Sequence, residues 1–503
     1  MNRLKLALLG IISILLFISC GKENKKTEKI VTVAYVGSAK TLDPQMTNDK
    51  RSIEVMAQLY DSLVELNENS VIVPAIAERW EKIDPLRTRF YIKENIKFHN
   101  GDLLTVNDIK FSLNRLKNSP VVGTVGEPID RVEIINDKTI DVITKYPYSP
   151  ILLNLSDYSA SIVSEKAVTS DEKGFGQKPV GTGAYILENW SNIDKIILKK
   201  NKNYFRGEPK IDKLVFKAIP EAGVRVIGLE TGEIDVAYTV SPIDVPTVIK
   251  NNNLDIISKS PSAIEFIGFN TSKAPFNNKD LRKAVTYTLD VNEILKAVLS
   301  TYGTNINSPL APSAFGYTTD RPTYTKDLEK AKEYLKKSGY ENGLTVEMTY
   351  HSNQVSEQIA QIMQAQLKEI GIELKVNPLE WSAFINSTSK GEQQMFHLGR
   401  TAPTNDANEA LVVFNSKSKG SGGNRFFYDN PSVDKLLDEA SKESNTEKRA
   451  LLYKEAINYI QEDSVMAFSF TRDVIVGVNK RVKGLNIHPS GVNKFKNIYI
   501  EER

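Results

Sequence analysis

The apolar and polar positions of this chain alternate in blocks that predict both strands and helices. Thr88–Ile92 alternates between the two kinds of side chain, which is typical of a half-buried strand, and Ile96–Phe98 predicts a second, shorter strand. Apolar residues then recur at helical spacing from Val106 to Leu116. The residues just before them, Thr105-Val-Asn-Asp108, have the form of a capping box, in which side chains close the first turn of a helix. This stretch therefore predicts two strands and a capped helix.

Farther along the chain, a helix, a glycine and a strand follow one another. Apolar residues from Ile359 to Ile370 form one face of a helix, Gly371 ends it, and Ile372–Val376 alternates like a strand. Such units favour a mostly parallel sheet that is covered by helices. The fold class expected from them is α/β.

Two glycines in the segment Pro179-Val-Gly-Thr-Gly-Ala-Tyr185 predict a place where two backbone segments cross closely. Glycine permits this because it has no Cβ and adopts conformations that other residues avoid. A phosphate-binding loop is the other interpretation of G-x-G. However, no Lys-Ser/Thr pair follows here, and two glycines alone are a weak signal.

Length and charge limit the class of protein. The 503 residues suggest about three domains on a prior of roughly 150 residues each. A hydrophobic share of 41% is ample for a core. The formal net charge is only +3, and nucleic-acid binding would call for a clustered basic face. We therefore expect no nucleic-acid partner.

The N-terminus has the pattern of a secretory signal peptide. Two basic residues precede the apolar run Leu6–Ile18, which is shorter than the ~18 residues that a membrane span needs. Cys20 follows almost at once; as the single cysteine, it excludes an internal disulfide bond. We expect residues 1–19 to be the signal peptide and residues 20–28, which are mostly polar, to be a flexible tether.

No constellation of catalytic or metal-binding residues is evident. The G-x-S-x-G and H-E-x-x-H motifs are absent. A metal site would need the fold to bring together histidines that are far apart in the sequence, namely His99, His351, His397 and His488. We therefore expect a binding protein with no cofactor rather than an enzyme.

Several longer strings occur in a fixed order along most of the chain. The first is Ala77-Glu-Arg-Trp80, followed by F-x-I-K-x-x-I-K-F-H-x-G-D-x-L-T-x-x-D-I-K-F-S-L up to Leu113. Others are P-V-G-T-G-A-Y at 179–185, G-E-I-D ending at Asp235, and N-T-x-x-x-P-F-x-x-x-x-L-R-x-A ending at Ala284. Together they resemble the family 5 extracellular solute-binding proteins, which are the peptide, nickel and glutathione receptors of ABC importers.

This resemblance implies the two-lobe periplasmic-binding-protein fold, of type II and similar to cluster C, with an extra subdomain on the first lobe. The ligand is then enclosed between the lobes, and the chain passes between them more than once. The expected first lobe comprises residues 29–62, 180–268 and 478–503, the subdomain residues 63–179, and the second lobe residues 269–477.

The resemblance also implies where the ligand lies. In peptide receptors of the family, a segment G-W-x-x-D supplies an aspartate for the peptide ammonium, but here Arg400 and Pro403 occupy the Trp and Asp positions. The following segment, Thr404–Leu411, resembles the glutathione-binding branch. We expect Asp406 to meet an ammonium group, and Arg400 and Arg425 to meet carboxylates by paired hydrogen bonds. The other ligand contacts expected from the resemblance are Thr41, Leu42, Trp381, Thr401, Ala402, Thr404, Asn405, Phe426 and Tyr428.

The function that the resemblance implies is the capture of glutathione or short peptides by a substrate-binding lipoprotein of an ABC importer. Cys20 would carry the lipid and hold a monomeric protein outside the cytoplasm, in the periplasm or at the outer face of the cytoplasmic membrane. Its partners would be a permease and its ATPase. Two alternatives stay open. One is a receptor for nickel or a metallophore, and the other is a surface protein for adhesion, signalling or chaperoning without transport.

Overall fold

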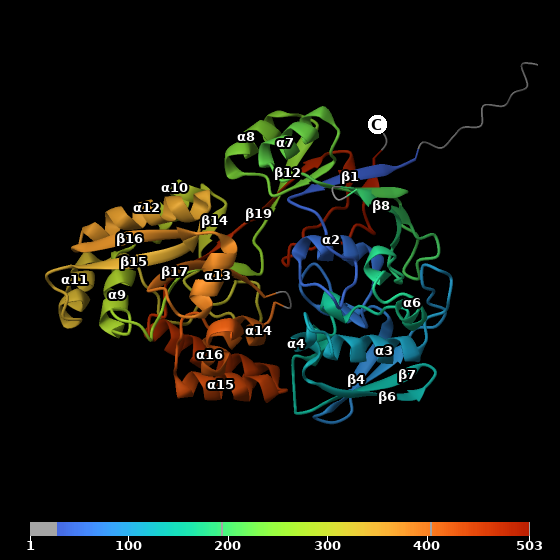
Figure 1. The fold of residues 1–503 in the computed structure, drawn as a ribbon, viewed down its shortest axis with the longest axis horizontal. Helices are drawn as coiled ribbons and strands as arrows, with labels where there is room; N and C mark the ends of the chain where they lie inside the picture. Colours follow the sequence, from blue (N-terminus) through green and yellow to red (C-terminus); the bar gives the residue numbers. More distant parts are fainter. Residues whose placement is uncertain (1–27, 193–194, 403–404, 502–503) are drawn as a thin grey trace, which may run out of the picture.

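The structure, a computed structural model, describes residues 28–192, 195–402 and 405–501. The chain forms two lobes that lie side by side, with a smaller subdomain beneath the first lobe (Figure 1). Each lobe is built on a mixed β-sheet, and the subdomain has a sheet of its own. No helix in the described ranges is long and apolar enough to cross a membrane.

The first lobe holds a seven-stranded sheet in the order β12-β19-β11-β1-β10-β9-β8. β1 lies parallel to its neighbours β10 and β11, whereas the outer strands pair in antiparallel directions. The strands are β1 (Ile30–Tyr35), β8 (Tyr185–Asn192), β9 (Lys195–Lys200), β10 (Lys213–Ala218), β11 (Val236–Tyr238), β12 (Leu254–Lys259) and β19 (Val474–Asn479). Helix α2 (Lys50–Leu59) covers one side, and α7 (Ala222–Thr231) and α8 (Val245–Lys250) cover the other (Figure 1).

The second lobe holds a six-stranded sheet in the order β14-β18-β13-β17-β15-β16. Its strands are β13 (Ala263–Phe269), β14 (Gly303–Asn305), β15 (Leu344–His351), β16 (Ile372–Leu379), β17 (Met395–Thr401) and β18 (Met466–Arg472). One hydrophobic core joins the sheet to α9 (Lys279–Thr288), α10 (Val291–Leu299), α11 (Leu328–Lys337) and α12 (Gln354–Lys368). A second core joins it to α13 (Trp381–Ser389), α14 (Ala407–Leu411), α15 (Pro431–Lys442) and α16 (Thr446–Glu462). The predicted unit of helix, glycine and strand is confirmed, because α12 precedes β16, which pairs in parallel with β15.

The subdomain combines a four-stranded sheet in the order β4-β5-β7-β6 with a two-stranded ribbon, β2-β3. Its elements are β2 (Val64–Leu66), β3 (Ile72–Pro74), β4 (Ala77–Lys82), β5 (Arg87–Ile92), β6 (Ile129–Asn136), β7 (Thr139–Thr144), α3 (Val106–Lys117), α4 (Gly123–Gly126), α5 (Ile151–Asn154) and α6 (Glu165–Ser170). The predicted capping box of Thr105 and Asp108 is present at the start of α3. Ile96–Phe98 does not form the predicted strand. The chain turns back at Gly101, so this segment makes only the isolated bridge between Lys97 and Leu103.

The predicted close crossing of two backbone segments is confirmed at Gly181 and Gly183. Gly183 N donates to Leu59 O over 2.9 Å, and His99 N donates to Gly181 O over 2.9 Å. A Cβ on Gly181 would lie 2.1 Å from the oxygen of Leu59, so only glycine fits there. The two glycines therefore fix the returning subdomain chain against the end of α2.

The sheets show where the chain passes between the lobes. It leaves the first lobe at residues 260–262, between β12 and β13, and returns at Asp473, between β18 and β19. Both crossings come earlier than the expected boundaries at 268 and 477. The reason is that β13 pairs along its length with the second-lobe strand β17, and β19 pairs fully with β12. A short ribbon, β20 (Val482–Lys483) and β21 (Tyr499–Ile500), lies in the C-terminal part of the chain.

The subdomain and the second lobe also touch on the side away from these crossings (Figure 1). Ser149 N donates to Ser441 O over 3.0 Å, and Ser149 Oγ donates to Glu443 O, where α15 ends. Asn408 Nδ2 donates to Tyr148 Oη over 3.3 Å. The lobes are therefore in contact on both sides of the region between them.

Candidate functional site

Three neighbouring strands of the second lobe, β15, β16 and β17, run parallel to one another. Open α/β sheets bind ligands outside the carboxyl ends of such strands. β17 ends with Arg400 and Thr401, and Trp381 begins α13 directly after β16. Three of the residues expected from the sequence thus lie at the sheet edge where a ligand site is expected.

Arg400 carries a charge that the surrounding protein compensates poorly. Its Nη2 donates to the backbone oxygen of Glu409 over 2.7 Å, and its Nε is buried without a hydrogen-bond partner. Within the described ranges, Arg400 makes no ion pair shorter than 4 Å. Burial lowers the pKa of its guanidinium, and the negative charge of Glu409 opposes this shift. A partly buried cation in this state favours an anionic partner.

Arg400 lines a hollow of the second lobe with a volume of about 10 Å³. The neighbouring lining residues are small or apolar and include Ser262, Phe266, Ala314, Ala402 and Val413. This volume is close to the roughly 10–15 Å³ that a cavity needs to hold a single water molecule. The hollow itself is therefore too small for a peptide-sized ligand.

Asp406, the expected partner of a ligand ammonium, is already paired inside the second lobe. It is buried, and it accepts hydrogen bonds from both terminal nitrogens of Arg449, with Nη1 at 2.9 Å. It also caps α14 by accepting from Asn408 N over 2.8 Å. Both carboxylate oxygens are used, so the structure gives Asp406 a role in folding rather than the expected one. The sequence gives no sign that Arg449, 43 residues away, is its partner.

Arg425, expected to meet a ligand carboxylate, instead holds the end of α13. Its Nη1 donates to Ile385 O and to Thr388 Oγ1, both over 3.0 Å, and also to Ser389 Oγ. A cation near the C-terminus of a helix also interacts favourably with the helix dipole. The guanidinium of Arg425 is therefore occupied by the protein in this arrangement.

Phe426 and Tyr428, expected as walls of the ligand pocket, belong to the hydrophobic core of the second lobe. Phe426 is 1% exposed and stacks on Phe414, with ring centroids 4.9 Å apart. Tyr428 is buried, and its hydroxyl donates to Asp463 over 2.6 Å. These rings pack inside the second lobe and do not face an open site.

The expected aromatic contact Trp381 has different surroundings, because its side chain is 49% exposed. Its ring lies edge-on to His351, with centroids 5.3 Å apart, at the carboxyl end of β15. Trp381 is therefore accessible to a ligand at the sheet edge.

The remaining expected contacts of this segment differ in exposure. Thr401 is exposed. Ala402 is buried and donates its N–H to Ser262 O over 3.4 Å. Asn405 is buried and bonds twice to Ser313. Thr404 lies outside the described residues.

The expected first-lobe contacts, Thr41 and Leu42, belong to a turn at the junction with the subdomain. Leu42 is fully buried, and its carbonyl accepts a hydrogen bond from Tyr60 Oη over 2.8 Å. The next residue, Asp43, pairs with Arg115, whose Nη1 lies 2.7 Å from Oδ1. Only Thr41 keeps part of its side chain accessible. The turn is therefore chiefly a structural junction.

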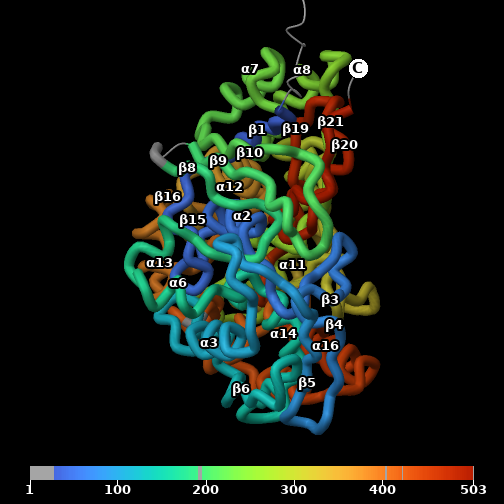
Figure 2. The backbone as a smooth tube through the Cα atoms, turned by 90° about the vertical axis from the view of Figure 1, so that its right-hand side faces the viewer, coloured from blue at the N-terminus to red at the C-terminus, as the bar shows by residue number. Residues whose placement is uncertain are grey.

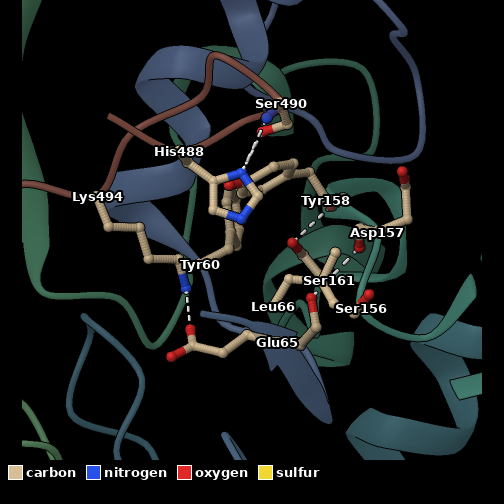
Figure 3. A pocket seen from close by; sticks show the side chains of 11 residues that line it. Tyr60, Glu65, Leu66, Ser156, Asp157, Tyr158, Ser161, His488, Ser490 and Lys494 are labelled. Atoms are coloured by element: carbon tan, nitrogen blue, oxygen red, sulfur yellow. Dashed lines mark hydrogen bonds and ion pairs between the residues drawn. The ribbon is translucent and has the colours of Figure 1, made fainter. Parts of the chain in front are cut away.

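A hollow of the first lobe, of about 30 Å³, was not expected from the sequence (Figure 3). Glu65 and Lys494 form an ion pair on its wall, and Arg206 pairs with the other oxygen of Glu65. Burial alone would raise the pKa of Glu65, but the charges of Lys494 and Arg206 hold it well below its usual range. These three residues come from distant parts of the chain, so no local pattern indicates the hollow.

His488 and Ser490 lie on the opposite wall of this hollow (Figure 3). Nδ1 of His488 accepts a hydrogen bond from Ser490 N over 3.1 Å, and Nε2 lies 3.0 Å from Asn67 O. The proton therefore sits on Nε2. Burial lowers the pKa of this imidazole, so it is neutral at pH 7.

Ser262 links the two hollows across the crossing between the lobes. It lines the second-lobe hollow, and its N–H donates to Pro489 O over 2.9 Å, next to His488 of the first-lobe hollow. The two hollows are therefore neighbours in the region where the lobes meet. Among the residues that the structure describes, no group of His, Cys, Asp and Glu is placed to hold a metal ion.

Two lobes joined by crossing segments, with hollows of both lobes adjoining the crossing, define the class of two-lobe solute-binding proteins. The comparisons agree. The model of the bacterial extracellular solute-binding proteins, family 5 Middle, matches residues 71–422. The chain belongs to this family, and the resemblance seen in the sequence is confirmed.

Relatives and solved structures cover almost the whole chain. The chain is 28% identical over 485 residues to the glutathione-binding protein GsiB of Pectobacterium atrosepticum, covering 93% of this chain and 94% of the relative. It is 26% identical over 509 residues to the dipeptide-binding protein of Escherichia coli K12, covering 94% and 95%. The periplasmic binding protein DppA from Helicobacter pylori, solved in complex with the peptide STSA, has a TM-score of 0.81 and 28% identity, covering 96% and 100%. The two-lobe fold is thereby confirmed, and the chain is a substrate-binding receptor.

Proposed function

We propose that this receptor captures glutathione or short peptides outside the cytoplasm and delivers them to the permease of an ABC importer, which its ATPase drives. Relatives across the full length are named for glutathione and for dipeptides, which supports this ligand class. Ligands of both kinds carry at least one carboxylate and one ammonium group. The protein must therefore offer them a cation and an anion.

The observation that carries the proposal is the state of Arg400. Its guanidinium is partly buried at the carboxyl end of β17, has a backbone carbonyl as its hydrogen-bond partner, and has a buried Nε without a partner. A charge-assisted hydrogen bond to a carboxylate contributes roughly 1.5–3 kcal/mol. That corresponds to about one to two decades in affinity.

Calorimetric titration of the purified wild-type protein tests this function. The ligands are glutathione, Ala-Ala and Ala-Ala-Ala, each beside a form whose carboxylates are amidated. We expect at least one free ligand to bind and to raise the melting temperature, and its amidated form to bind at least tenfold more weakly. Binding of none of the three free ligands would refute the proposed ligand class. Native mass spectrometry of freshly purified protein adds an independent reading of any retained ligand.

We also propose that the mature receptor is a monomer held at the membrane by a lipid on Cys20, which lies outside the described residues. The support is the short apolar run ending just before a lone cysteine. Cys20→Ser is expected to move the protein from the membrane fraction to the soluble extracytoplasmic fraction. A variant that stays with the membranes would contradict the anchor.

A further inference from the structure

The first lobe also holds a charge without a close partner, the carboxylate of Glu54. Glu54 belongs to α2, and this helix lies beneath the first-lobe sheet (Figures 1 and 2). Within the part of the chain that the structure describes, its carboxylate makes no hydrogen bond and no ion pair. Lys50 and Arg51 act on it only at longer range, and Arg51 lies 3.6 Å from Asp49 instead.

Three elements meet around Glu54. Gln58, one turn later on α2, donates to Glu54 O over 3.1 Å and to Asn493 O over 2.7 Å. Asn493 in turn donates to the hydroxyl of Tyr238, the last residue of β11, over 2.6 Å. Burial and then the charge of Glu54 raise the pKa of Tyr238, so the two side chains are close. Glu54 therefore lies between α2, the end of β11 and the loop that contains Asn493.

This location is where the first lobe is expected to meet a ligand. β1 and β11 are parallel, and ligands of open α/β sheets bind outside the carboxyl ends of such strands. The loop that contains Asn493 also reaches the crossing to the second lobe, because Pro489 O accepts a hydrogen bond from Ser262 N. The surroundings of Glu54 thus extend to the region between the lobes.

The exposure and the acidity of Glu54 describe its environment further. Its side chain is partly exposed, yet burial raises its pKa from 4.5 to about 7, against the opposing charges of Lys50 and Arg51. Both properties fit a side chain that water reaches but that protein largely surrounds. A carboxylate there is unfavourable alone and is stabilised by an incoming cation.

We propose that Glu54 is a ligand-binding residue that receives the ammonium group of the peptide or glutathione. This inference rests on the proposed function and assigns to Glu54 the role first expected of Asp406, whose charge Arg449 neutralises. The ligand then spans the lobes, with its ammonium at Glu54 of the first lobe and a carboxylate at Arg400 of the second. A zwitterion of this kind holds both lobes, so each end of the ligand contributes to closure.

The test compares ligands with and without the charge in question. Glutathione and Ala-Ala-Ala are titrated beside their N-acetyl derivatives into the wild type, Glu54→Gln and Glu54→Asp. Glu230→Gln, a change at an exposed carboxylate on the first-lobe helix α7, is the matched control. We expect the wild type and the control to prefer the free amine by about tenfold or more. We expect Glu54→Gln to lose that preference and Glu54→Asp to keep part of it.

The outcomes separate the two proposals. If the wild type binds none of glutathione, Ala-Ala and Ala-Ala-Ala, the proposed function fails. If the wild type binds the free and acetylated ligands equally, or Glu54→Gln keeps the full preference, the function stands and the role of Glu54 is refuted. The preference is a ratio measured on one protein, so a partly unfolded variant does not imitate its loss.

Discussion

The second lobe holds a buried arginine, Arg449, and a partly buried one, Arg400, and their surroundings are opposite. Arg449 donates to both oxygens of Asp406 and also to the hydroxyl of Tyr453. Arg400 has a single backbone carbonyl and an Nε without a partner. A buried charge with a complete set of partners contributes to the fold, whereas a buried charge without them lowers stability unless something else binds it. The difference distinguishes a structural pair from a site prepared for a ligand.

Breaking the pair of Asp406 and Arg449 is expected to have the largest effect on stability. Asp406→Asn leaves the buried guanidinium of Arg449 without its counter-charge. We expect the free energy of unfolding to fall by about 3–5 kcal/mol. Denaturant unfolding followed by circular dichroism measures it. Asp320→Asn is the control, because Asp320 forms its ion pair with Lys454 at the surface, with its side chain 82% exposed; its change is expected within about 0.5 kcal/mol. Equal effects of the two substitutions would contradict the comparison.

Glu54 extends the comparison to pH, because an unpaired buried acid changes stability as it ionises. Its pKa is about 7 when folded and 4.5 ordinarily, so the folded state binds the proton more tightly. Stability contributed by the protonated form is therefore lost as pH rises from about 4.5 to about 7. Above pH 7 we expect Glu54→Gln to be more stable than the wild type by up to about 3 kcal/mol. The measurement is the difference between the two unfolding free energies at pH 5 and pH 8; a difference that does not grow with pH would contradict the burial of this charge.

For Arg425 we predict a smaller effect, which is a loss of stability rather than a loss of ligand binding. Arg425→Ala removes the side chain that hydrogen-bonds to Ile385 O and Thr388 Oγ1 in α13, so we expect a loss of about 1–2 kcal/mol in unfolding free energy. Ligand affinity, measured well below the melting temperature, is expected to stay within about threefold. Arg131→Ala, on an exposed part of the subdomain, serves as the control. A tenfold loss of affinity with unchanged stability would restore Arg425 to the ligand site.

Local patterns predicted much of the fold, because the signals that fix single elements lie close together in the sequence. Thr105 and Asp108 are three residues apart and form the predicted capping box. The crossing at Gly181 and Gly183 was predicted from the glycines alone. Ile96–Phe98 failed because alternation favours a strand but does not supply a neighbouring strand with which to pair.

The charged residues of the site were harder to predict, because their roles depend on partners distant in the sequence. In the sequence, Asp406 and Arg400 are simply two charged residues of one segment. Only the position of Arg449 in the fold shows that Asp406 is already paired. Glu54 was missed for the same reason. On α2 it has the spacing of an ordinary polar helix residue, and its burial comes from β11 and from residues near Asn493. The family strings indicated the carboxyl edge of the second-lobe sheet but not which charges the fold leaves without a partner.

The most direct test of the account is a calorimetric titration of glutathione, or of whichever short peptide the wild type binds best, into Arg400→Gln and the wild type at equal pH. The account predicts that the variant binds about tenfold to hundredfold more weakly. It also predicts that the ligand-free variant is at least as stable as the wild type, because the substitution removes a poorly compensated charge and only one hydrogen bond to a backbone carbonyl. An affinity equal to that of the wild type would show that Arg400 does not hold the ligand, and the central claim would be wrong.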